Sequence, residues 1–243
     1  MDLKYRDYLY KNYARNLSMS EMASNFDKQL VLINRYFIKN YLPHFPADKS
    51  IAIIDIGCGK GAYLLACKMN GYSNVTGVDL SESNVKFCIE HEIPCEQKDG
   101  YEYLKNAKDS YDVIFFNDVI DHLTKDEVID MLLVMKEALR NNGIIIVKVT
   151  NMANPYTGPA GRYIDFTHEI GFTEISLKQV FDALEFSNVM VYGAKIYIKN
   201  NPLFWIASIV EKITSFTLFL LSYLYGRKSI RIFTKNLICV ARK

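Results

Sequence analysis

The stretch Ile53–Gly61, with the sequence IIDIGCGKG, is the part of the chain that decides the fold. It begins with apolar, β-branched residues, which are typical of a strand buried on both faces. It ends in three glycines at alternate positions, which let the backbone turn tightly and let a ligand approach it closely. A helix is predicted to begin at Ala62, and the free N–H groups of its first turn can bind an anionic part of that ligand. The stretch therefore predicts a strand, a ligand-binding loop and a helix in succession.

Strands and helices alternate along the chain on both sides of this stretch. Strands are predicted at Ile51–Ile56, Asn74–Leu80, Cys95–Lys98, Tyr111–Asn117, Ile144–Thr150, Val189–Ile198 and Ile230–Ala241. Helices are predicted at Ala62–Asn70, Ser83–His91, Tyr101–Leu104, Lys125–Asn141 and Ser176–Glu185, with Gly143 closing the fourth of them. Alternation with short loops indicates parallel crossovers. The predicted fold is therefore α/β, a doubly wound, mostly parallel, seven-stranded sheet.

The length of 243 residues suits one globular domain. Residues Asp2–Leu42 carry apolar positions at helical spacing and end at Pro43 and Pro46, so we expect one or two N-terminal helices. We expect residues 1–46 to form a helical cap, and residues 47–243 to form the main domain with a helical insertion at 202–226.

Acidic residues at three strand ends make the glycine loop more specific. Asp55 lies directly before the loop, where a dinucleotide-binding fingerprint usually carries no acid. Asp79 closes the next strand, where a carboxylate can accept hydrogen bonds from both hydroxyls of a ribose. Asp99 and Gly100 follow the third strand, where they could hold an adenine amino group. A dehydrogenase of the Rossmann type would need a third glycine at the position of Ala62.

With these residues in register from Ile51 to Thr150, the chain resembles the class I S-adenosylmethionine-dependent methyltransferases. The resemblance implies that S-adenosylmethionine is the cofactor and S-adenosylhomocysteine the product. It implies that the loop faces the methionine part, that Asp79 faces the ribose, and that Asn117 lies beside the sulfonium. The expected cofactor site is Asp55, Gly57, Cys58, Gly59, Gly61, Asp79, Leu80, Asp99, Gly100 and Asn117.

Methyl transfer to a hydroxyl needs a base, and two histidines lie where an active site is expected. His122 follows the fourth strand, and His168 lies in the long loop after the fifth strand. Long loops inside compact domains are usually functional. Asp165 precedes His168 by three positions and could orient its ring, so we expect His168 to rank above His122 as the catalytic base. A structural role for Thr167 and His168, as a cap of the next helix, remains the alternative.

The same loop carries candidate acceptor-binding residues, namely Arg162, Tyr156 and Tyr163. It resembles methyltransferases of bacterial surface-polysaccharide (O-antigen or capsule) pathways in Arg162, Asp165, Thr167, His168, Phe172, Thr173, Ser176 and Leu177. This resemblance implies O-methylation of a sugar hydroxyl in a surface glycan or its lipid-linked precursor. The alternatives are an O-methyltransferase of a quinone or another lipid-soluble molecule, and a cofactor-binding regulator without turnover.

Several classes of partner are disfavoured. Residues 1–185 hold 20 basic against 26 acidic side chains, and a net acidic surface repels nucleic-acid phosphates. Residues 117–120 (NDVI) lack the Asn/Asp-Pro-Pro-aromatic motif of amino-group methyltransferases, which favours an oxygen acceptor. No grouping has convincing metal-ligand spacing, so no metal is expected. Five scattered cysteines and a polar N-terminus indicate the cytoplasm.

Residues 203–225 form an apolar run that is long enough to suggest a membrane helix. Its polar positions share one helical face: Ser208, Glu211, Lys212, Ser215 and Ser222. Basic residues follow it: Arg227, Lys228, Arg231 and Lys235. This pattern is typical of a helix that lies on an anionic membrane, and it predicts contact of residues 202–235 with the inner face of the cytoplasmic membrane. Packing on its own domain or on a second subunit of a homodimer is the alternative.

Overall fold

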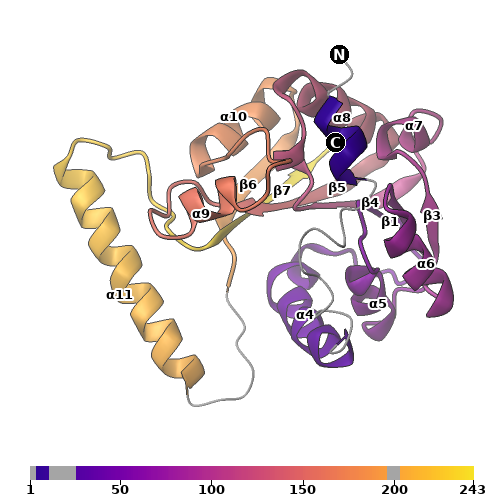
Figure 1. Cartoon of the computed structure of the whole chain (residues 1–243), viewed down its shortest axis with the longest axis horizontal. Coiled ribbons are helices and arrows are strands. Elements are labelled where there is room, and N and C mark those ends of the chain that lie inside the picture. Colours follow the sequence, from indigo (N-terminus) through magenta and orange to yellow (C-terminus); the bar gives the residue numbers. More distant parts are fainter. Residues whose placement is uncertain (1–3, 11–25, 196–202) are drawn as a thin grey trace.

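The computed structural model describes residues 4–10, 26–195 and 203–243, and it is built around one seven-stranded sheet with helices on both faces (Figure 1). The strands lie in the order β3-β2-β1-β4-β5-β7-β6. Their bounds are Ile53–Ile56 (β1), Val75–Asp79 (β2), Cys95–Gln97 (β3), Tyr111–Asn117 (β4), Leu139–Thr150 (β5), Ser187–Gly193 (β6) and Asn236–Arg242 (β7). The predicted α/β fold is confirmed.

Helices connect the strands and cover the sheet. Their bounds are Lys4–Tyr10 (α1), Phe26–Asn40 (α4), Ala62–Met69 (α5), Glu82–Glu90 (α6), Gly100–Leu104 (α7), Lys125–Ala138 (α8), Gly158–Tyr163 (α9), Glu174–Ala183 (α10) and Leu203–Leu224 (α11). Short 3₁₀ turns lie at Leu42–His44 and Ile120–His122. As predicted, helices come before the first strand, and a long helix comes between the last two.

The first five strands in the order are parallel, and β7 runs antiparallel to both β5 and β6. All four residues of β1 are buried, as expected for a central strand with helices on both faces. The carboxyl ends of β1, β2 and β4 therefore meet at one edge of the sheet. In such folds, ligands bind outside that edge.

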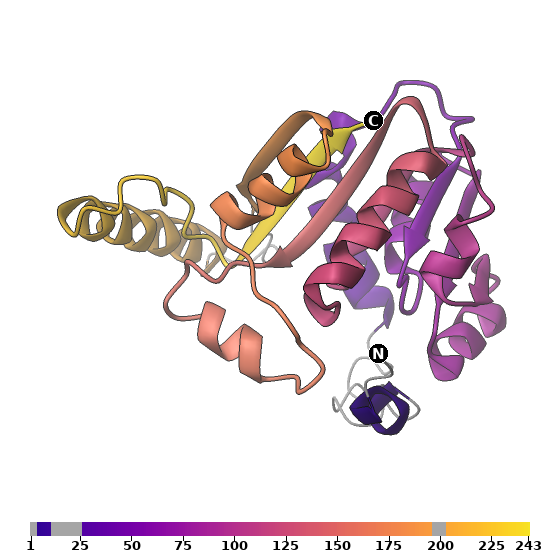
Figure 2. The same ribbon diagram turned by 90° about the horizontal axis from the view of Figure 1, so that it is seen from above.

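Each face of the sheet has its own apolar core. On one face, Met135 of α8 and Phe181 of α10 pack with Phe116 of β4. On the other face, Phe37 of α4 and Leu64 of α5 pack with Phe115. Helix α4 therefore lies beside α5 against the sheet and contributes to the core (Figures 1 and 2).

Some boundaries differ from the predictions. The helix predicted at Lys125–Asn141 ends at Ala138, because the buried Leu139 turns to extended backbone and pairs with Tyr111. The last strand begins at Asn236 rather than at Ile230. The last three residues of the predicted strand Val189–Ile198 lie outside the described residues, and β6 covers Ser187–Gly193.

Candidate active site

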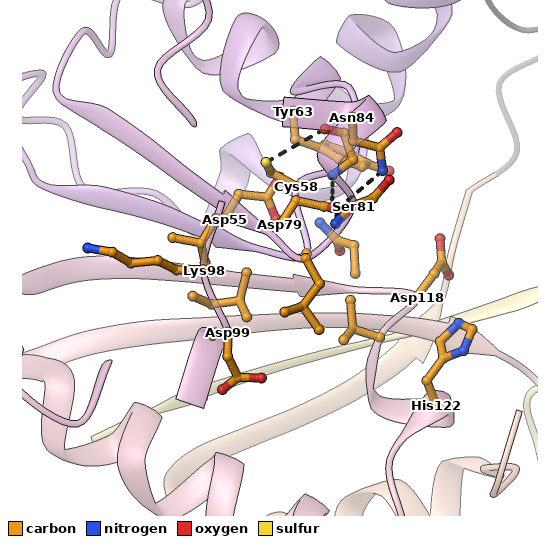
Figure 3. A pocket seen from close by; sticks show the side chains of 18 of the residues that line it. Asp55, Cys58, Tyr63, Asp79, Ser81, Asn84, Lys98, Asp99, Asp118 and His122 are labelled. Carbon is orange, nitrogen blue, oxygen red and sulfur yellow. Dashed lines mark hydrogen bonds between the residues drawn. The ribbon is translucent and has the colours of Figure 1, made fainter. Parts of the chain in front are cut away.

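A cavity of about 680 Å³ opens at the carboxyl ends of β1, β2 and β4. All predicted cofactor residues except Gly61 line it: Asp55, Gly57, Cys58, Gly59, Asp79, Leu80, Asp99, Gly100 and Asn117. Figure 3 shows the side chains of Asp55, Asp79 and Asp99 in this cavity together with that of His122. A volume of this size is within the usual range for small-molecule sites.

Two glycines give the loop after β1 its shape. Gly57 has a φ of +71°, and a Cβ there would lie 2.5 Å from Cγ2 of Val119. Only glycine therefore allows the loop to lie so close to the segment after β4. Gly59 has a φ of +55°, and a Cβ there would meet nothing within 4 Å. Because Gly59 lines the cavity, that open space is available to a bound ligand.

Asp79 ties the glycine loop to the start of α6. Its Oδ2 accepts a hydrogen bond from the Gly59 N–H at 2.8 Å, and its Oδ1 accepts one from the Ser81 N–H at 2.8 Å. Burial raises the pKa of Asp79, while these hydrogen bonds act in the opposite direction. The carboxylate is thus held rigidly at the edge of the cavity, in the position predicted for a ribose-binding acid.

Two buried polar atoms in the cavity wall have no hydrogen-bond partner among the described residues. They are Oδ1 of Asp55, whose residue is 1 % exposed, and Nδ2 of Asn117, whose Oδ1 accepts from the Tyr41 hydroxyl at 2.8 Å. Burial, and then the nearby Asp79, raise the pKa of Asp55 well above its usual range. Unpaired buried polar atoms are costly and are expected to have a ligand. A ligand with an ammonium group and a carboxylate, such as the methionine part of S-adenosylmethionine, fits this pair.

Gly61 lies behind the loop, outside the cavity lining. It has a φ of +70° at the start of α5, and a Cβ there would meet Ile93 and Cys88. Its conformation thus serves the packing of the loop on the domain. Cys58, Cys88 and Cys95 gather in the same region, with their sulfur atoms within 4.8 Å of one another.

A charged pair lies at the wall of the cavity, which Asp118 and Tyr63 line. Lys148 of β5 forms an ion pair with Asp118, and its Nζ lies 3.5 Å from the Tyr63 hydroxyl. Burial lowers the pKa of Lys148, but Asp118, Tyr63 and Tyr36 together outweigh burial and hold that pKa above its usual range. Lys148 carries no signal in the sequence, because its partners come from segments far apart in the chain.

His122 lines the cavity and is held by the loop after β5. Its Nδ1 lies 2.8 Å from Oγ1 of Thr167, whose hydroxyl donates to Oδ1 of Asp165 at 2.7 Å. A carboxylate only accepts hydrogen bonds, so the hydroxyl proton of Thr167 lies in the hydrogen bond to Asp165. In the contact with His122, Oγ1 of Thr167 is therefore the acceptor and the Nδ1–H of His122 is the donor. Burial, and then the neighbouring His168, lower the pKa of His122 to about 4. The imidazole is therefore neutral at pH 7, with Nε2 as its acceptor nitrogen.

His168 lies behind His122 and is not among the residues that line the cavity. The two rings meet edge to face with centroids 4.5 Å apart. His168 Nδ1 lies 2.7 Å from the Gly161 carbonyl oxygen, and its Nε2 lies 3.7 Å from Oδ2 of Asp121. The rank of His168 above His122 as the base stays a prediction, but this geometry favours the reverse.

Asp121, His122 and His168 form a group whose ligand atoms lie within 4.8 Å of one another. Asp121 is buried, which raises its pKa, and its Oδ1 has no hydrogen-bond partner among the described residues. These residue types could hold a divalent cation. The expectation of no metal stays a prediction.

The other candidates of the loop after β5 lie away from the cavity. Arg162 donates to the carbonyl oxygens of His168 and Glu169, so it fixes the backbone of the loop. Asp165 was expected to orient His168, but the hydroxyl of Thr167 links it to His122 instead. The side chains of Tyr156 and Tyr163 are 88 % and 81 % exposed. Their role in acceptor binding therefore stays a prediction.

N-terminal residues that the sequence analysis did not single out complete the cavity. Arg6 of α1 and Phe26, Gln29 and Ile33 of α4 line it. Arg6 binds both carboxylate oxygens of Glu127, at 2.6 and 2.8 Å, and the carbonyl oxygen of His122. Phe26 and Ile33 thus add an apolar wall to the cavity, and Arg6 attaches α1 to α8.

Comparisons with known proteins agree with this site. A family described as a methyltransferase domain matches residues 31–191. The ubiquinone biosynthesis O-methyltransferase of Rickettsia bellii is 29 % identical over 121 residues, which cover 48 % of this chain and 49 % of that protein. The chain thus spans about half the length of this curated relative.

Solved structures show the same fold. An S-adenosylmethionine-dependent methyltransferase from Archaeoglobus fulgidus has a TM-score of 0.65 at 24 % identity, covering 88 % of this chain and 94 % of that chain. A phosphoethanolamine N-methyltransferase from Haemonchus contortus, in complex with S-adenosylmethionine, has a TM-score of 0.58 at 17 % identity, covering 89 % and 52 %. With a family match over most of its length and a cavity that fits the cofactor, the chain belongs to the S-adenosylmethionine-dependent methyltransferases.

Proposed function

We propose that this methyltransferase acts on a hydroxyl group of a lipid-soluble, ring-containing small molecule of the quinone type. The observation that carries the proposal is a neutral histidine in a cavity that also has an apolar wall. His122 supplies a base for a hydroxyl proton, and the apolar wall favours an apolar acceptor. A neutral amine, in contrast, attacks through its own lone pair and needs no base to take up a proton during the transfer.

The chain's own residues would then act as follows. S-adenosylmethionine, when bound, supplies the methyl group on its sulfonium. Asp55, Asp79 and Asn117 bind and orient it from the sheet edge. His122 accepts the proton of the acceptor hydroxyl at Nε2 as the oxygen forms its bond to the methyl carbon and the carbon–sulfur bond breaks. The Thr167–Asp165 pair fixes the tautomer and stabilises the imidazolium that results.

The shape of the cavity supports an apolar acceptor. The residues that line it include Phe26, Ile33, Val119, Leu123 and Met131. Apolar pockets with a few placed polar groups are typical of small-molecule sites. The relative from Rickettsia bellii is named for ubiquinone biosynthesis, which is consistent with this class of acceptor.

A surface glycan is the second candidate acceptor, and it rests on the resemblance of the loop after β5. The loop contributes Thr167 to the positioning of His122, but Arg162 binds backbone carbonyls of the loop instead of lining the cavity. A regulator without turnover is less consistent with the site, because cofactor binding alone would not need the His122–Thr167–Asp165 chain.

One experiment separates these functions. The protein is titrated with S-adenosylmethionine by calorimetry and then incubated with radiolabelled cofactor and either a bacterial lipid extract or a delipidated glycan extract. We expect binding, and transfer of label into the lipid extract with a mass increase of one methyl group. Label in the glycan fraction alone would support the glycan acceptor, and binding without any transfer would support the regulator.

A further inference from the structure

Helix α11 exposes a large apolar surface. Residues Trp205–Leu224 have a mean hydropathy of 1.4, and none of this segment is buried. The side chains of Trp205, Ile213 and Phe216 are 71 %, 61 % and 67 % exposed. Figures 1 and 2 show α11 standing beside the domain, away from the sheet. Soluble monomers rarely expose so much contiguous apolar surface, which marks an interaction site.

The exposed apolar residues share one side of the helix. At 100° per residue, they fall within an arc of about 160°. They are Trp205, Ile206, Ile209, Val210, Ile213, Phe216, Leu220, Leu221, Tyr223 and Leu224. The opposite side carries Ser208, Glu211, Ser215 and Ser222 together with Leu218 and Phe219, and all of these are only partly exposed; the exposed Lys212 lies on the same side. This side, which holds most of the polar positions, faces away from whatever the apolar arc contacts.

Both ends of the segment are tied to the domain. The Ala194 N–H donates to the Asn236 carbonyl oxygen at 2.9 Å, so the chain leaves the sheet and returns to it at neighbouring points. After the helix, the carboxylate of Glu174 accepts from the Arg231 and Ile232 N–H groups at 2.9 and 2.6 Å. Residue 231 is therefore fixed on the domain surface.

These ties decide between a helix that spans a membrane and one that lies on it. The hydrocarbon core is about 30 Å thick. From Tyr225 to Arg231 the chain reaches at most ~22 Å, and from Lys195 to Leu203 at most ~29 Å. Neither end of α11 can thus lie across a bilayer from the domain. If α11 did span the bilayer, the segment that leads from it back to the domain would also carry Arg227 through the hydrocarbon core. The helix can only lie parallel to the surface.

The charges around α11 favour an anionic surface. From residue 203 to 235 the chain has five basic residues, Lys212, Arg227, Lys228, Arg231 and Lys235, and one acidic residue, Glu211. Arg227 and Lys228 directly follow the helix, and Lys228 lies over the ring of Tyr223. Basic residues beside an inserted apolar face add electrostatic attraction to anionic lipid headgroups.

A second group of exposed apolar side chains lies around α9. Tyr156, Tyr163, Ile164 and Phe166 are between 76 % and 88 % exposed. In Figures 1 and 2, α9 lies beyond the end of β5, on the same side of the sheet as α11. Aromatic residues of this kind are enriched where proteins meet the headgroup region.

We propose that α11 is a membrane anchor that lies in the headgroup region of an anionic lipid surface, with its apolar arc toward the acyl chains and the α9 loop beside it. This inference does not depend on the identity of the methyl acceptor.

The single tryptophan of the chain, Trp205, lies on the apolar arc and reports on lipid contact directly. The whole protein is mixed with vesicles of phosphatidylcholine with or without phosphatidylglycerol. We expect co-flotation and a blue shift of tryptophan emission with phosphatidylglycerol vesicles, and at least tenfold weaker binding without the anionic lipid. Absence of flotation and of any emission shift would overturn the proposal.

The depth of Trp205 in the bilayer is measured by quenching of its fluorescence with lipids brominated near the headgroup or deep in the acyl chain. The measurement is repeated with Trp205→Phe/Phe216→Trp, which moves the tryptophan to the middle of α11. A helix parallel to the surface gives shallow quenching of both probes. Deep quenching of the mid-helix probe would show that α11 spans the bilayer and would contradict the proposal.

The variant Ile209→Glu/Ile213→Glu places two charges on the apolar arc and should abolish flotation. The control Ile89→Glu/Leu133→Glu adds the same charge at two exposed apolar residues of α6 and α8 and should bind vesicles as the unaltered protein does. Equal loss in both variants would mean that charge alone drives binding. A lipid-free dimer that only the α11 variant dissociates would assign the arc to a second copy of the chain.

Discussion

At the scale of single residues, Gly59 is the position where the backbone leaves space for a ligand. The variant Gly59→Val would place a side chain into the cavity and should weaken S-adenosylmethionine binding at least tenfold, as measured by calorimetry. Gly226→Val is a matched control, because Gly226 also has a positive φ, of +77°, and open space at its Cβ, but lies after α11. Both variants carry similar backbone strain. Equal loss of affinity in both would show that strain, and not occupied space, is the cause.

Asp79 is the residue expected to bind the ribose. Asp79→Ala removes the carboxylate that faces the cavity. It also removes the two hydrogen bonds that this carboxylate accepts from backbone N–H groups. Losing charge-assisted hydrogen bonds costs about 1.5–3 kcal/mol, so the dissociation constant should rise at least tenfold. Circular dichroism and thermal unfolding check that the fold is kept. Unchanged affinity in a folded Asp79→Ala protein would place the ribose elsewhere.

The two histidines are separated by kinetics. We expect His122→Asn to lower kcat about 10²-fold or more with little change in cofactor affinity, because a base contributes about 10²–10⁴-fold. His168→Asn should have a smaller effect on kcat, since His168 does not line the cavity and packs behind the ring of His122. If the larger loss of kcat occurs in His168→Asn, the base is His168, as the sequence analysis ranked it.

The buried imidazole of His122 also makes stability depend on pH. Its pKa is about 4 in the folded protein and about 6.5 in the unfolded chain, so the unfolded chain binds more protons between these values. The free energy of unfolding should therefore fall by about 3 kcal/mol as pH drops from 6.5 to below 4. Urea unfolding measures this, and the slope in that window should flatten in His122→Gln relative to the exposed control His91→Gln. An unchanged slope in His122→Gln would mean that other groups produce it.

At the scale of elements, Asn151 joins the loop after β5 to the segment that leads into β7. It is fully buried, and its Nδ2 donates to the carbonyl oxygens of Ile232 and Thr234 at 2.9 and 3.0 Å. Asn151→Ala leaves both carbonyls without this donor, so we expect a loss of about 2–4 kcal/mol in the free energy of unfolding. The control Asn106→Ala lies at an exposed position and should change it by less than about 0.5 kcal/mol.

Elements with a strong local pattern could be predicted, and those set by distant partners could not. The strand Tyr111–Asn117 was predicted to the residue, because a run of apolar residues between polar ends has one interpretation. The segment 230–235 has the composition of a strand, yet the carboxylate of Glu174 and the amide of Asn151 bind its backbone groups in place of a sheet partner.

The candidate site likewise has parts that local sequence patterns predict and parts that depend on distant residues. The residues that line the cavity beside β1, β2 and β4 could be predicted, because each lies at the end of its strand or directly after it. The Thr167 link to His122 joins residues 45 positions apart, and Arg6 reaches Glu127 across 121 positions. Such contacts depend on how the loop after β5 and the N-terminal helix fold onto the domain, which no local spacing encodes.

At the scale of the whole molecule, the core and α11 are separate in structure. The buried apolar residues lie on the two faces of the sheet, and the described side chains of α11 contribute none of them. The charge divides along the sequence in a similar way: residues 1–185 are net acidic, and residues 186–243, which include α11, are net basic. If α11 serves the location of the enzyme and not its fold, it can be removed without loss of the domain.

We therefore expect a variant in which residues 197–228 are replaced by a flexible linker to fold and to bind S-adenosylmethionine. A linker of about twelve residues reaches ~40 Å, and it leaves the contacts of residues 231–234 with Glu174 and Asn151 in place. Because β6 and β7 pair directly, with Gly193 opposite Leu237, the sheet should form as it does in the unaltered protein.

Calorimetry of this variant should give a cofactor affinity within about twofold of the unaltered protein, since no cavity residue is removed. Methylation of a water-soluble acceptor analogue should persist, while methylation of an acceptor embedded in anionic vesicles should fall at least tenfold. Loss of cofactor binding in this variant would show instead that α11 supports the fold of the site.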